Sequence, residues 1–264
     1  LSNFMLYGTT AHIDAARRLG VAISLAPDWA PSGSKSILGE LKVADLVNKN
    51  RLGNQLSDRE LAAMVTRAPA AAIGWEARLG QLAPGYLADL VVLDERNPNP
   101  YRNLIEAIEE NVRLVWVQGV ALYGDSRLMQ GLRAASDIEE AGLFANRRPK
   151  MVAMNCPALP TTTLPAVKET LQAALSITPE LILKRVSPAQ LTTDLAACQS
   201  KPADPPTLED ARRAMACRFG LPFEKTLLSP FATSDDGDFF PRLLANPNLP
   251  PYLKKLPDYY RRQQ

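Results

Sequence analysis

Asp28 is the residue whose type and position most directly suggest chemistry in this 264-residue chain. It follows an apolar run at residues 21–26, where β-branched and aliphatic side chains predict a short buried strand. A loop with Pro27, Pro31 and Gly33 comes next. A carboxylate held at a rigid strand end can accept and return a proton during catalysis. The alternative interpretation is that Asp28 only caps a turn before the next helix.

The loop after Asp28 contains a second possible motif. Ser32 and Lys35 fit S-x-x-K, in which a lysine can activate a serine nucleophile. The companion motifs S-D-N and K-T-G do not occur in the sequence. The pattern therefore favours a loop and a helix cap, and a serine hydrolase remains a weaker alternative.

The elements that must position these residues alternate between helix and strand. Thr10 and Gly20 predict the start and end of a helix over 11–19, and Ile37, Leu38, Leu41 and Ala44 have helical spacing after the loop. Ser57 and Glu60 have the spacing of a capping box, and a short helix is predicted from Thr66 to about residue 73. Alternation of this kind predicts α/β layers.

A small β unit follows from Gly80. A strand is predicted over 88–93, and two more strands fold about Gln118–Gly119 as a hairpin, with the unit ending near Tyr123. The chain from about Asp125 is predicted to be mostly helical. Helix starts are predicted at Thr178–Pro179, Ser187–Pro188 and Pro206–Thr207. Nothing catalytic is recognised in residues 126–264.

The composition excludes several classes of function. The formal net charge of +2, without a basic stripe, argues against nucleic acid as a partner. No apolar run is long enough to predict a membrane span. The three cysteines lack C-x-x-C spacing and are interpreted as buried thiols, with a disulfide between two of them as the alternative. A disulfide would indicate an oxidising compartment.

Three motifs in order resemble the amidohydrolase superfamily. They are "SNFMLYG" at 2–8, "GVAISLAPD" at 20–28 and "TRAPAAAIGWEARLGQLAPGYLADLVVLD" at 66–94. The resemblance covers about residues 1–125 and is strongest to the branch with cytosine, guanine and adenosine-type deaminases and chlorohydrolases. It implies a metal-dependent hydrolase that attacks a C–N bond of a small molecule by hydrolysis or deamination.

The resemblance also implies the architecture. Residues 1–79 would be the last strand–helix units of a (β/α)8 barrel, 80–124 part of a small β-sandwich, and 125–264 a mainly helical extension of unknown role. Asp28 would end the final barrel strand, on the face where such barrels place catalysis. In the family this aspartate binds the metal, takes a proton from metal-bound water and passes it to the leaving group. Trp29 and Ser32 would line the substrate pocket, although Trp29 also suits ordinary packing.

The metal ligands are the main departure from the family. Family members take most ligands from histidines, including an H-x-H pair, whereas this chain has one histidine, His12, on a predicted helix away from any ligand position. Asp28 alone cannot hold a catalytic zinc, which needs about three protein ligands. We therefore expect a C-terminal piece of a longer hydrolase that is inactive by itself, with zinc or iron bound only in the full-length parent.

The sequence also carries expectations about compartment, assembly and an alternative function. The chain is expected in the cytoplasm, or in the periplasm or outside the cell if a missing N-terminal part carries a signal, and it is a possible homo-oligomer. The alternative function is a non-catalytic scaffold or binding subunit with an eroded barrel. The substrate and the number of metal ions are not predicted.

Overall fold

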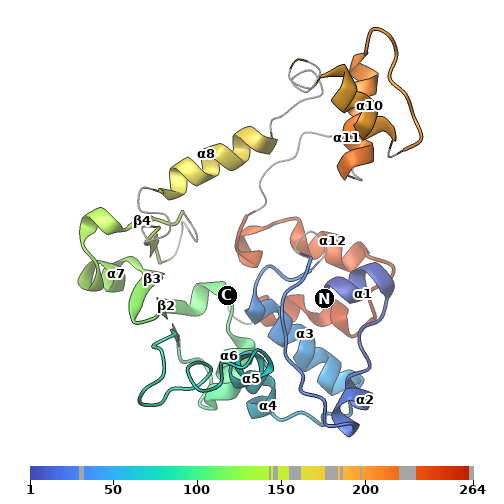
Figure 1. The fold of residues 1–264 in the computed structure, drawn as a ribbon. Coiled ribbons are helices and arrows are strands. Elements are labelled where there is room, and N and C mark those ends of the chain that lie inside the picture. The colour runs from blue at the N-terminus through green and yellow to red at the C-terminus, as the bar shows by residue number, and fades with distance from the viewer. Residues whose placement is uncertain are drawn as a thin grey trace. The chain divides into compact units, whose positions relative to one another are not determined.

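The computed structural model of the chain falls into two compact units, each described here by itself (Figure 1). One consists of Leu1–Thr161 with Pro230–Gln264, and the other of Thr162–Ser229. The structure describes residues 1–29, 33–142, 144, 148–154, 162–175, 184, 187–196, 198–219 and 230–261.

Short helices form the first part of the larger unit. They are α1 (Ser2–Tyr7), α2 (Ile13–Arg18), α3 (Ile37–Asn50), α4 (Asp58–Ala63) and α5 (Arg67–Ala72). The predicted capping box of α4 is confirmed: Ser57 Oγ accepts from the Glu60 N–H at 3.3 Å, and Glu60 Oε2 accepts from the Ser57 N–H at 2.8 Å. The predicted cap of α2 is wrong, because the helix begins after His12 rather than Thr10 and has no side-chain cap.

An antiparallel sheet follows, in the spatial order β1-β2-β3-β5-β4. Its strands are β1 (Leu90–Leu93), β2 (Val112–Val117), β3 (Val120–Asp125), β4 (Glu139–Glu140) and β5 (Lys150–Val152). The predicted hairpin is confirmed, since Gln118 and Gly119 have φ of 51° and 80°, as a two-residue type I′ turn requires. The β unit was predicted to end near Tyr123, and this is wrong. Strands β4 and β5 come later in the sequence and belong to the same sheet, with β5 paired to β3. The helices that come between these strands in the sequence are α6 (Pro100–Glu106), η1 (Glu109–Asn111), α7 (Ser126–Leu132) and η2 (Ala135–Asp137).

The strand predicted over 21–26 is also wrong. The structure assigns no strand to these residues. A strand is defined by hydrogen bonds to a neighbouring strand, and the sheet of the described residues consists of strands from other parts of the chain. The residues that the structure describes therefore do not form a (β/α)8 barrel. They do combine helices with a sheet, as the predicted α/β class requires.

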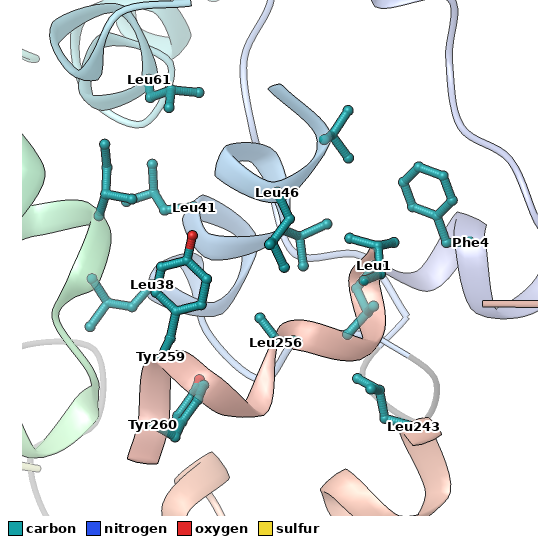
Figure 2. Packing of buried hydrophobic residues seen from close by; sticks show 14 of the residues in the cluster. Leu1, Phe4, Leu38, Leu41, Leu46, Leu61, Leu243, Leu256, Tyr259 and Tyr260 are labelled. Atoms are coloured by element: carbon teal, nitrogen blue, oxygen red, sulfur yellow. The ribbon is translucent and has the colours of Figure 1, made fainter. Parts of the chain in front are cut away.

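The core of the larger unit joins its two sequence segments. The second segment contains η3 (Thr233–Asp235), α12 (Phe239–Ala245), η4 (Leu253–Lys255) and α13 (Pro257–Arg261). Figure 2 shows Leu38, Leu41 and Leu46 of α3 packed with Leu256 and Tyr259 from this C-terminal segment, all members of one buried cluster. Apolar residues near the chain end thus help to bury α3.

The smaller unit is helical in its described residues. It contains α8 (Leu164–Leu175), α10 (Pro188–Ala196) and α11 (Leu208–Phe219), with Leu191, Leu195 and Ala214 in a small buried cluster. The predicted helix starts at Ser187–Pro188 and Pro206–Thr207 are confirmed, whereas Thr178–Pro179 lies outside the described residues. Cys198 is disulfide-bonded, so its interpretation as a free thiol is wrong. The three-part domain division stays a prediction.

Candidate functional site

The segment that carries Asp28 begins at a well-defined helix end. The Gly20 N–H donates to the Arg17 carbonyl at 3.0 Å and the Val21 N–H to the Ala16 carbonyl at 2.9 Å. These paired bonds form a Schellman motif, and Gly20 takes the left-handed conformation it needs, with φ of 68°. The chain therefore leaves α2 in a fixed direction toward Asp28.

The following residues keep the alternating burial of a strand without its hydrogen-bonded neighbours. Ile23 and Leu25 are half-buried against the core, whereas Ala22, Ser24 and Ala26 are exposed. The Leu25 N–H donates to the Met64 carbonyl at 2.9 Å, which attaches the segment beside the end of α4. The period of two in the sequence thus sets which side chains face the core.

Asp28 and Trp29 lie on the surface at the end of this segment. Asp28 is exposed and accepts no hydrogen bond from a described residue. The Trp29 side chain is 56% exposed, so it is not a core tryptophan of the described part of the chain. Ser32 lies outside the described residues. The structure therefore leaves the predicted roles of these three residues as predictions.

The backbone carbonyl of Trp29 lies close to Gly33. A Cβ atom at Gly33 would lie 2.8 Å from the Trp29 carbonyl oxygen and 3.2 Å from Ser2 Cβ. The first distance is shorter than a van der Waals contact, so this position favours glycine. The Trp29 backbone thus lies against the chain a few residues before α3.

Lys35, the lysine of the S-x-x-K pattern, is engaged by an ion pair. Its Nζ lies 2.7 Å from Asp236 Oδ2, and the side chains are 10% and 6% exposed. Burial raises the pKa of Asp236, but hydrogen bonds from Lys35 and the Asp238 N–H outweigh this and hold it below its ordinary value. The lysine that a serine hydrolase would use as a base thus has a carboxylate partner, which weakens that alternative.

Comparison with known proteins identifies the segment that contains Asp28. A sequence model of the amidohydrolase family matches residues 9–123. Residues 9–123 belong to the amidohydrolase superfamily.

Three similar proteins show how much of an amidohydrolase is present. The 5-methylthioadenosine/S-adenosylhomocysteine deaminase of Nitratidesulfovibrio vulgaris is 34% identical over 136 residues, which are 48% of this chain and 31% of that protein. The 5′-deoxyadenosine deaminase of Methanothermobacter thermautotrophicus is 35% identical over 107 residues, 39% of this chain and 25% of that protein. The imidazolonepropionase of Pseudomonas aeruginosa is 40% identical over 86 residues, 33% of this chain and 20% of that protein. The chain spans less than a third of the length of these relatives.

The amidohydrolase segment does not supply a metal site by itself. Among the described residues, no three His, Cys, Asp or Glu side chains come together in a way that could hold an ion. His12, the single histidine, lies directly before α2 and faces solvent. The described residues therefore do not fit the divalent metal of the family without further ligands.

A second set of polar residues was not predicted from the sequence. Glu109 in η1 accepts hydrogen bonds from Ser36 and Thr233, residues distant in sequence from it and from each other. No spacing rule connects residues 36, 109 and 233, because their proximity depends on the tertiary fold. An acidic pair, Glu109–Glu110, is the sole signal that the sequence offers.

The described residues lack a helix long and apolar enough to cross a membrane.

Proposed function

We propose that this chain is the Asp28-bearing C-terminal part of a metal-dependent amidohydrolase that hydrolyses or deaminates a C–N bond in a small molecule. The match over residues 9–123 carries this proposal, because it places Asp28 inside the family segment. The deaminase names of similar proteins support the same class of reaction.

Asp28 is the residue we assign to proton transfer in the complete enzyme. Its carboxylate is exposed and therefore accessible to a substrate. The residues before it are attached to the end of α4 by the hydrogen bond from the Leu25 N–H to the Met64 carbonyl. A positioned carboxylate of this kind contributes as a general base or acid. Trp29 and Ser32 are proposed to contact the substrate. The zinc or iron of the family would need histidine ligands from outside these 264 residues, since the chain has one histidine.

The DNA that precedes the Leu1 codon in the same reading frame provides the first test. The proposal predicts that it encodes an H-x-H pair followed by further spaced histidines. A start codon directly before Leu1, with a stop codon ahead of it, would contradict the proposal and support the scaffold alternative.

The second test measures Asp28 in the extended protein. With the histidine-bearing part present, Asp28→Asn is expected to lower kcat for ammonia release from a small C–N substrate by roughly 10²–10⁴-fold, the usual effect of losing a general acid or base. Asp258→Asn, a carboxylate outside the matched residues, is the control and should retain activity. An active Asp28→Asn with an inactive Ser32→Ala would instead establish the serine hydrolase.

A further inference from the structure

A cavity of about 400 Å³ in the larger unit is lined by α2 and by the residues that follow α3. Its walls are mostly polar side chains, and Asp28 and Trp29 are not among them. The volume falls within the roughly 300–1,000 Å³ of small-molecule sites in proteins. The cavity is therefore large enough for a small molecule and is separate from the residues proposed to carry out catalysis.

Positive charge predominates on these walls. Arg17 and Arg18 come from the last turn of α2, and Arg51 directly follows α3. Asp14 provides the single carboxylate among the described lining residues. Guanidinium groups stay charged at any ordinary pH, so three of them on one cavity repel one another. An anion bound between them would lower this repulsion.

The ion pairs already present leave most of the guanidinium donors available. Arg18 contacts Asp14 and Arg17 contacts Glu60, each at 3.5 Å, whereas a strong charge-assisted hydrogen bond measures roughly 2.7–2.9 Å. Arg51 forms no side-chain hydrogen bond or ion pair within the described part of the chain. Because each guanidinium carries five N–H donors, the walls offer more donors than one carboxylate can accept.

Asp14 shows that arginines from both sides of the cavity act on the same place. Its own backbone N–H is the main cause that lowers the pKa of Asp14; burial opposes this, and the charges of Arg18 and Arg51 lower the pKa further. The side chains of Arg18 and Asp14 are 72% and 47% exposed, so their ion pair is weak. A bound anion can therefore compete with Asp14 for these two arginines.

We propose that this cavity binds a dianionic phosphate group, either as the free ion or as a monoester of a small molecule. Arg18 and Arg51 donate to its terminal oxygens, because the planar guanidinium fork matches phosphate bidentately. Arg17 and the ring N–H of His12 supply further donors from the wall. A dianion suits the site better than a monoanion, since three positive charges face the one negative charge of Asp14.

Isothermal titration calorimetry of the 264-residue chain in dilute Tris chloride at pH 7.5 tests the site with matched probes. Phenyl phosphate is mainly a dianion at this pH, and phenyl sulfate has nearly the same shape with one charge. We expect phenyl phosphate to bind roughly 10-fold more tightly, because its second charge strengthens the hydrogen bonds from the arginines. Equal binding of the two probes, or no binding of phenyl phosphate, would overturn the proposal.

Inorganic phosphate, titrated in the same way, distinguishes the two sources of the phosphate group. An affinity equal to that of phenyl phosphate supports a site for the free ion, and a weaker affinity supports a site for a monoester. The affinity for either probe should fall as NaCl is added, because salt screens the charges of exposed arginines.

Two matched pairs of variants place the probe in the cavity. Arg51→Met removes a guanidinium of the wall and should weaken phenyl phosphate roughly 10-fold. Arg59→Met removes the same charge from an exposed position outside the cavity and should have little effect. Asp14→Asn removes the competing carboxylate and should strengthen binding roughly 3-fold, whereas Glu95→Gln, exposed and outside the cavity, should not.

The proposal fails if Arg51→Met and Arg59→Met, both folded by circular dichroism, bind phenyl phosphate equally. If Arg51→Met does not fold, Asp14→Asn decides, because binding no tighter than that of Glu95→Gln would place the probe outside the cavity.

Discussion

At the scale of single residues, the larger unit buries charge in the middle of α3. Lys42 is fully buried, and its Nζ lies 5.6 Å from the centre of the Tyr260 ring. Burial is the main cause that lowers the pKa of Lys42 from 10.5 to about 8, with the nearby acidic residues opposing it. Asp45, one turn further on, is also buried; burial raises its pKa, but hydrogen bonds from Arg102, Lys49 and Tyr259 outweigh this and lower it. Neither residue is assigned a role in the proposed chemistry.

The lowered pKa of Lys42 predicts a specific pH dependence of stability. Between pH 8 and about 10 the unfolded chain holds the lysine proton that the folded chain has lost, so the free energy of unfolding rises with pH. At 1.36 kcal/mol per pKa unit, the full change is on the order of 3 kcal/mol. Urea unfolding of Lys42→Met should lack this rise, whereas Lys254→Met, an exposed control, should keep it. Parallel curves for wild type and Lys42→Met would contradict the expectation.

At the scale of elements, the sequence predicted the features that depend on neighbouring residues but not those that depend on residues distant in the chain. The Ser57–Glu60 capping box and the Gln118–Gly119 turn are confirmed, because each depends on residues within one turn of chain. The prediction of a strand over 21–26 was wrong, because a strand needs hydrogen bonds to a neighbouring strand and the sequence of the segment itself does not specify that neighbour. For the site, the family motifs selected Asp28, whereas the contacts of Glu109 with Ser36 and Thr233 could not be predicted from spacing.

The capping box provides the test at this scale. Ser57→Ala removes the side-chain acceptor for the Glu60 N–H and should lower the free energy of unfolding by about 1 kcal/mol, the typical effect of losing a cap. Ser24→Ala, in the exposed part of the extended segment, makes the same chemical change without a cap and should have little effect. Chemical denaturation monitored by circular dichroism compares the two variants. Equal stabilities would mean that α4 does not depend on its cap.

At the scale of the whole molecule, the larger unit is discontinuous in sequence. Residues 230–261 return to pack on α1 and α3, with Leu253 and Leu256 fully buried beside Phe4 and Leu46. This return could not be predicted, because apolar spacing marks the face that a helix buries but not the partner it meets. The intervening Thr162–Ser229 has its own small cluster and forms a separate unit.

This organisation predicts that the smaller unit is dispensable for folding of the larger one. Residues 162–229 would be replaced by a flexible Gly/Ser linker of about 20 residues, with an average span of roughly 25 Å. Thermal unfolding should then stay cooperative with a similar midpoint, because the α3 core and residues 230–261 remain. Leu253→Ala is the matched perturbation of that core and should lower the stability of both the complete and the shortened chain by roughly 2–5 kcal/mol. A shortened chain that unfolds without a transition, or that is insensitive to Leu253→Ala, would show that the larger unit needs residues 162–229 to form its core.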